Sequence, residues 1–281
     1  MGQVGSLRNL NWGAILTTAC CLMFGLVVVV MHKKMYEVMM HDPSYQLKMD
    51  QLQAASFPDW ASGRVKEDVQ QKLASGPSLS IYDAQFLRKL TARYEASTWV
   101  RDVRSIKRRG LDGVKVTLEL RRPVAVIADR QGRTFLVDRK GVRLPGTYRN
   151  IPERFGTVYR IKGHALKVPE PGKAWKSGRI KAAVTVAAHL QRSKLSRVLR
   201  VRYLELDGSV EDWRKGNGQI IIRTSNNKSV VWGGTEEHGN PWEPSPNRKL
   251  KNLRRVLRGA PDLVGLKTVK LQFSDPIVSM Q

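Results

Sequence analysis

The first strong pattern along the chain is an uncharged apolar run at 12–31, which ends just before Lys33 and Lys34. At 1.5 Å rise per residue, a helix over this run is about 30 Å long, which matches the hydrocarbon core of a bilayer. No small-residue cleavage pattern follows it, as a cleaved signal peptide would require. We therefore expect an uncleaved transmembrane helix at 12–31, after a short tail at 1–11 and before a polar, Met-rich stalk at 32–54.

The apolar spacing beyond the stalk is first helical and then alternating. Val65, Val69 and Leu73 recur every four positions, as on the buried face of a helix. From residue 100 onward, apolar and polar residues alternate, as in half-buried strands. The predicted elements are helices at 64–74 and 83–96, strands at 100–109 and 114–128, and a turn at 110–113. This order predicts a small α/β domain at 55–128, with two helices on one face of a sheet; in the second helix, the inward residues are Phe86, Leu87, Leu90 and Tyr94.

From residue 129 to residue 281 the pattern is mainly that of strands. The predicted strands are 134–138, 142–144, 198–206, 218–224, 229–232 and 264–273, with loops at 145–178 and 233–246. Two helices interrupt them, one at 179–193 and one that Ser245 can cap and that Gly259 ends. The fold class is therefore α+β: an N-terminal transmembrane helix, a small α/β domain, and a mainly antiparallel β domain with packed helices.

The net charge of +25 comes from 49 lysines and arginines against 24 acidic residues. A field this positive favours an anionic neighbour, which the charge alone does not identify: anionic lipid, a wall polymer or nucleic acid. A solvated basic surface without a specific ligand is an equal alternative. Nucleic acid is not expected, because aromatic side chains for base stacking are not interleaved with the cations. The charges flanking the apolar run leave the orientation in the membrane open.

Residues for catalysis or metal binding form no recognisable pattern in the sequence. Both cysteines, Cys20 and Cys21, lie in the apolar run, and the five histidines form no metal-binding spacing. No phosphate-binding loop, dinucleotide motif or nucleophile elbow is present. We therefore expect no enzyme activity, no cofactor, and no catalytic, cofactor-binding or metal-binding residue.

Five short motifs occur in a fixed order between residues 99 and 273. They are W-V at 99–100, R-R-P-V-A at 121–125, L-V-D-R-K-G at 136–141, V-V-W-G at 230–233 and V-K-L-Q-F at 269–273. In this order and spacing, the chain resembles the FtsQ/DivIB family of bacterial cell-division proteins from about residue 76 to its end. The N-terminal anchor fits the same family.

The resemblance implies a POTRA domain at 55–128 and an FtsQ-type β domain at 129–281. It also implies a cytoplasmic N-terminus, with the body outside the inner (cytoplasmic) membrane and enriched at the division septum. The implied function is that of a non-catalytic scaffold of the divisome. Its partners are other single-span division proteins of the FtsB and FtsL types, bound by strand addition.

The resemblance also implies two groups of binding residues. The residues of the last strands that are implied to bind the partner are Val269, Leu271, Phe273, Ile277 and Val278. For these residues, core packing is the equal alternative, because alternate residues of a strand face inward. The residues implied in recruitment to the septum are Trp99, Val100, Arg121 and Pro123. The alternative is that they are simply core and turn residues. The alternative function is a membrane-tethered basic domain that binds an anionic polymer or lipid surface.

Overall fold

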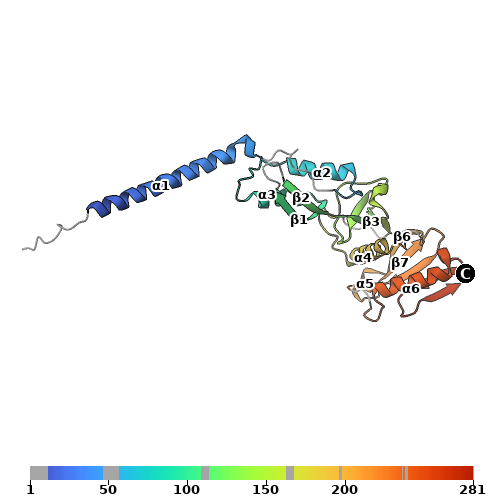
Figure 1. The fold of residues 1–281 in the computed structure, drawn as a ribbon. Helices are drawn as coiled ribbons and strands as arrows, with labels where there is room; N and C mark the ends of the chain where they lie inside the picture. Colours follow the sequence, from blue (N-terminus) through green and yellow to red (C-terminus); the bar gives the residue numbers. More distant parts are fainter. Residues whose placement is uncertain are drawn as a thin grey trace, which may run out of the picture.

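The computed structural model has a mixed α+β fold, and the described residues are 12–46, 57–108, 114–162, 168–195, 198–235, 237 and 240–280. A long N-terminal helix precedes a two-strand hairpin unit and a mixed eight-strand sheet (Figure 1). The expected tail at 1–11, the turn at 110–113 and part of the stalk lie outside the described residues.

The N-terminal helix α1 (Trp12–His41) is a single element that includes the predicted transmembrane segment and the start of the stalk. It is long and apolar enough to cross a membrane, as a single anchor or a signal sequence does, and none of its residues is buried. Thr17 and Thr18 donate their hydroxyl protons to the carbonyl oxygens four residues earlier. This bonding satisfies both hydroxyls within the helix, as an apolar environment requires.

The end of α1 is attached to the unit that follows it. After η1 (Pro43–Tyr45), Gln46 forms an isolated β-bridge with Ser80. The rings of Tyr45 and Tyr82 meet edge to face, with centroids 4.9 Å apart. Contacts between residues so distant in sequence position the base of the helix on the hairpin unit.

The hairpin unit contains both predicted helices. Its elements are α2 (Gly63–Ala74), α3 (Phe86–Glu95), β1 (Val100–Arg108) and β2 (Val114–Leu120). The helical spacing correctly predicts the buried side of α2, at Val65, Val69 and Leu73. Leu87 is 46% exposed, so its predicted inward position is wrong; Phe86, Leu90 and Tyr94 form the inner face of α3 instead.

The large sheet has the strand order β10-β9-β8-β7-β6-β5-β3-β4. Its strands are β3 (Pro123–Ala128), β4 (Thr134–Asp138), β5 (Tyr159–Lys162), β6 (Val201–Asp207), β7 (Gln219–Thr224), β8 (Ser229–Gly233), β9 (Leu266–Lys270) and β10 (Ile277–Met280). The pairs β3–β5, β5–β6 and β8–β9 are parallel, and the other four are antiparallel. The expectation of a mainly antiparallel sheet is therefore corrected to a mixed one, chiefly because β5 lies within the predicted loop at 145–178.

The predicted strand at 114–128 is two strands, separated at Arg121 and Arg122. β2 stays in the hairpin, whereas β3 pairs with β4 and β5 in the large sheet. Both faces of β3 are covered, since Val126 packs in the hairpin unit's core and its neighbours pack in the core of the large sheet. Continuous burial of this kind explains why the sequence of β3 is apolar throughout.

Helices α4 (Gly178–Ser193) and α6 (Pro246–Gly259) contribute their apolar stripes to the core of the large sheet. In α6 the predicted cap is confirmed, because the Ser245 hydroxyl accepts a hydrogen bond from the N–H of Arg248. Among the described residues beyond the stalk, three short helices were not predicted: η2 (Glu153–Phe155), α5 (Val210–Arg214) and η4 (Pro261–Leu263). Ser209 and Asp212 form a capping box at the start of α5.

Candidate partner-binding edge of the sheet

β10 forms one end of the large sheet and pairs with a single strand, β9. All four residues of β10 are exposed, including the apolar Ile277, Val278 and Met280. An edge strand presents backbone N–H and C=O groups that another chain can pair with. β10 has two features that usually protect an edge, a length of four residues and a register shift between Ser279 and Met280, but it carries no charged residue.

The five residues expected to bind a partner lie in two environments. Val269 and Leu271 are fully buried in the core, and the N–H of Leu271 donates to the carbonyl of Val231 over 2.9 Å. Phe273, Ile277 and Val278 are between 43% and 51% exposed. The expected strand at 264–273 ends at Lys270 and is covered by β10, so its placement at the sheet edge is wrong. The accessible candidates are the last three.

Helix α6 carries a basic surface beside this edge. A hollow of about 330 Å³ is lined by Asn252 and five cations of the helix: Arg248, Lys251, Arg254, Arg255 and Arg258. The opposite side of α6 is buried through Leu250, Leu253 and Leu257. The same helical period that buries the leucines therefore gathers the cations on the outer face.

The segment between β9 and β10 is fastened to this helix. Asn252 donates from Nδ2 to the carbonyl of Ser274 over 2.9 Å, and Arg255 forms an ion pair with Asp275 at 2.8 Å. The hydrogen bond and charge of Arg255 lower the pKa of Asp275 below its usual value. These contacts make the basic face and the exposed edge one continuous candidate surface.

A buried lysine holds the loop that leads into α6. Lys249 is 2% exposed and donates to the carboxylate of Glu243 and to the carbonyl of Gly234. Its ammonium group also lies over the ring of Trp232, 5.5 Å from the centroid. Burial lowers the pKa of Lys249, an effect that Glu243 opposes. Beside this clamp, Trp242 is 90% exposed, a position that the sequence analysis did not single out.

The residues expected to act in recruitment are not brought together as an open surface. Trp99 and Val100 are buried in the hairpin unit, where Trp99 stacks on Phe155 with centroids 6.1 Å apart. Arg121 pairs with Asp138 at 2.9 Å. Pro123 begins β3, and its carbonyl accepts a hydrogen bond from Gln191. Their positions agree with the core and turn alternative, and a recruitment role remains a prediction.

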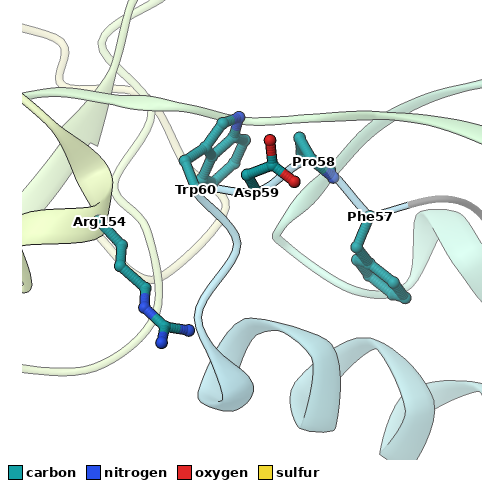
Figure 2. Close-up of a pocket in the computed structure, with 5 residues that line it drawn as sticks. All are labelled: Phe57, Pro58, Asp59, Trp60 and Arg154. Carbon is teal, nitrogen blue, oxygen red and sulfur yellow. The ribbon is translucent and has the colours of Figure 1, made fainter.

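A separate open hollow is formed by the residues just before α2 and by Arg154 of η2 (Figure 2). Phe57, Pro58, Asp59, Trp60 and Arg154 line it, and Figure 2 shows the Phe57 side chain directed away from Trp60. Its single carboxylate and single guanidinium do not converge on a common point. This arrangement offers no evident chemistry for a ligand.

Within the described ranges, no group of three or more His, Cys, Asp or Glu side chains is placed to hold a metal ion. Comparison with protein-family models gives no match, and comparison with curated proteins gives none either. The features of the chain that bear on its function are the exposed sheet edge, the charge of α6 and the motif resemblance.

Proposed function

We propose that the chain is a membrane-anchored scaffold of the FtsQ/DivIB type, which binds another single-span division protein by strand addition to β10. The observation that carries the proposal is the exposed, apolar and singly paired β10 at the end of an eight-strand sheet. An added strand pairs its backbone with the edge and packs its side chains beside those of Ile277 and Val278.

Charge supports a partner with acidic residues next to the added strand. The outer face of α6 carries five cations, and only Arg255 among them forms an ion pair with a carboxylate of the described residues. Complementary charge increases the association rate and selects the partner, while backbone pairing supplies the register. The proposed partners are proteins of the FtsB and FtsL types.

The apolar helix α1 supports the membrane placement in this proposal. α1 is a single helix that is long enough to cross a membrane. The chain just after it contacts the hairpin unit through the bridge between Gln46 and Ser80. In the proposed arrangement, the N-terminus is cytoplasmic, and the hairpin unit and large sheet are the extracytoplasmic POTRA and β domains. The protein is then enriched at the septum of the inner membrane.

The contact is tested by site-specific photocrosslinking in dividing cells with the full chain. A photoreactive phenylalanine analogue replaces Val278 in β10, or Val210 in α5 as the matched control, since both valines are exposed. We expect position 278 to crosslink to an FtsB- or FtsL-type protein and position 210 not to do so. Equal crosslinking at both positions, or none at 278 in correctly localised protein, contradicts the proposal.

Two proline variants test strand addition separately. Neighbouring residues of a strand direct their backbone groups to opposite sides, so one of Val278 and Ser279 points toward β9 and the other toward the open edge. Proline removes the N–H donor in each case. The crosslink is read from a photoreactive residue at position 277. Of Val278→Pro and Ser279→Pro, we expect the variant whose lost N–H faces the open edge to keep its unfolding midpoint and to lose the crosslink to the partner. Leu271→Pro is unsuitable for this test, because the Leu271 N–H bonds internally to Val231.

The second candidate function is binding of an anionic lipid or polymer by the basic face of α6. The cation-lined hollow on this helix is the observation that favours it. Such binding weakens steeply as the salt concentration rises, whereas strand addition responds much less. An N-terminal fluorescent fusion separates the two functions in cells: we expect a band at the division plane for the scaffold and a uniform envelope signal for the polyanion binder.

A further inference from the structure

A second charged site lies between the hairpin unit and the large sheet, away from β10. It is a cleft of about 240 Å³, and we refer to it as the arginine cleft. Its lining residues include five arginines and two carboxylates: Arg101, Arg121, Arg122, Arg139, Arg192, Glu119 and Asp138. The charged groups therefore leave an excess of three positive charges in a confined space.

The two carboxylates satisfy only part of this charge. Glu119 pairs with Arg101 at 2.8 Å and with Arg139 at 3.1 Å, and Asp138 pairs with Arg121. In the part of the chain that the structure describes, neither Arg122 nor Arg192 forms an ion pair with a carboxylate. The buried Nε–H of Arg121 has no hydrogen-bond acceptor there either. The cleft thus has guanidinium donors beyond those that its own carboxylates use.

The arginines come from separate elements and surround the cleft. Arg101 is on β1, Arg121 and Arg122 connect β2 to β3, Arg139 follows β4, and Arg192 is on α4. Next to Arg192, Gln191 donates from Nε2 to the carbonyls of Pro123 and Thr157, which fixes the end of α4 against β3. β3, which follows Arg121 and Arg122, is buried on both faces, so both cores hold the start of this strand beside the cleft.

We propose that the arginine cleft binds a compact phosphate-bearing ligand. Guanidinium groups form bidentate hydrogen bonds with phosphate and carboxylate oxygens. The oxygens of a tetrahedral phosphate point in several directions, so they match donors that converge from several elements better than the two oxygens of a planar carboxylate do. The volume is below the range of about 300–1,000 Å³ that is typical of larger organic ligands. The ligand is a free phosphate compound or a lipid phosphate headgroup, and this site is separate from the proposed partner edge.

Calorimetric titration of the full chain in detergent micelles tests the proposal. The probes are inorganic pyrophosphate, micelles containing phosphatidylglycerol, and acetate as a carboxylate control. We expect pyrophosphate or phosphatidylglycerol to bind and acetate not to bind at the same concentration. Binding of pyrophosphate supports a free compound, and binding of phosphatidylglycerol alone supports a headgroup. Absence of binding by both phosphate probes overturns the proposal, as does equal binding of acetate.

A matched pair of variants assigns the binding to the cleft. We expect Arg122→Gln/Arg192→Gln to weaken binding on the order of tenfold or more, since it removes two guanidiniums that have no carboxylate partner. Arg88→Gln/Arg130→Gln removes the same charge from two exposed arginines that lie outside both the cleft and the basic face of α6. We expect the pyrophosphate affinity of this control to stay within about twofold of the unsubstituted chain. Equal losses in both variants overturn the assignment. Unfolding midpoints verify that both variants are folded.

Discussion

Arg121 donates from Nη1 to Oδ2 of Asp138 over 2.9 Å, which ties the connection after the hairpin to the turn after β4. The Asp138 side chain is 2% exposed, and its Oδ1 also accepts hydrogen bonds from the N–H groups of Lys140 and Val142. A buried carboxylate requires such compensation, because an unpaired charge in the interior is costly. The Asp138 carboxylate therefore links the connection that follows the hairpin unit to the turn after β4 in the large sheet.

Asp138→Asn keeps the side-chain shape and removes this charge. We expect it to lower the free energy of unfolding by about 2 to 4 kcal/mol, somewhat less than for a fully buried pair because Arg121 remains partly solvated. Urea unfolding followed by circular dichroism measures the change. Asp275→Asn is the control, since it removes the same charge from an ion pair on the surface and is expected to lower the midpoint much less. Equal effects of both substitutions would contradict the prediction.

We expect Tyr94 to make the free energy of unfolding fall as the pH rises above 10. Burial on the inner face of α3 raises the pKa of Tyr94 from 10.0 to about 12. Because the folded state holds this proton more tightly, the contribution is complete below pH 10 and is lost as the pH rises toward 12. At about 1.4 kcal/mol per pKa unit, the full effect is about 3 kcal/mol.

Tyr94→Phe removes this titration. We expect the variant to lose less stability than the unsubstituted chain between pH 10 and 12, with a constant difference between the two proteins below pH 10. Thermal unfolding across this pH series measures the difference. Parallel pH profiles over the whole range would show that Tyr94 does not titrate with a raised pKa.

Gly218 lies against the ring of Trp213, and a Cβ at this position would overlap the ring atoms. The ring is held in place because its Nε1 donates to the carbonyl of Asp207 over 2.8 Å. We expect Gly218→Ala to destabilise the fold by about 1 to 3 kcal/mol through overpacking. Gly259→Ala, at the end of α6 with open space around it, is expected to be neutral or to stabilise by up to about 1 kcal/mol. Equal midpoints for the two variants in urea unfolding would contradict this account.

The sequence predicts elements whose signals are local. The boundaries of α6 follow from Ser245, Pro246 and the leucine stripe, and the structure confirms them. The four residues of β5 sit in a segment rich in glycine and proline, and they form a strand because β3 and β6 pair with them on both sides. Such pairing depends on residues distant in the chain, which a local pattern does not contain.

The candidate site was likewise only partly predictable from the local sequence. The motif resemblance placed partner binding on five C-terminal residues, and two of them, Val269 and Leu271, face the core, as the alternation of side chains along a strand had offered as the alternative. β10 was not predicted as a strand because all of its residues are exposed and show no buried alternation. The arginine cleft was also not predicted, because Arg101 and Arg192 are far apart in the sequence and line the same cleft only because α4 packs on β3.

The last prediction concerns the clamp between Lys249 and Glu243, which fixes the loop carrying Trp242. Lys249→Met removes the ammonium group and leaves the Glu243 carboxylate, with 13% of its side chain exposed, without its cation. We expect a loss of about 3 to 5 kcal/mol in the free energy of unfolding, because an uncompensated charge remains partly buried. Faster proteolysis at 240–245 should accompany this loss, since Lys249 donates hydrogen bonds to both Gly234 and Glu243.

A double-mutant cycle separates the ion pair from the packing of the lysine stem. Glu243→Gln with Lys249→Met removes both charges, and we expect it to be more stable than Lys249→Met alone, with a coupling energy of about 0.5 to 3 kcal/mol. Urea unfolding of the four proteins in the cycle gives this value directly. Additive effects would mean that Lys249 stabilises the loop by packing on Trp232, and the ion pair would then contribute nothing to the position of Trp242.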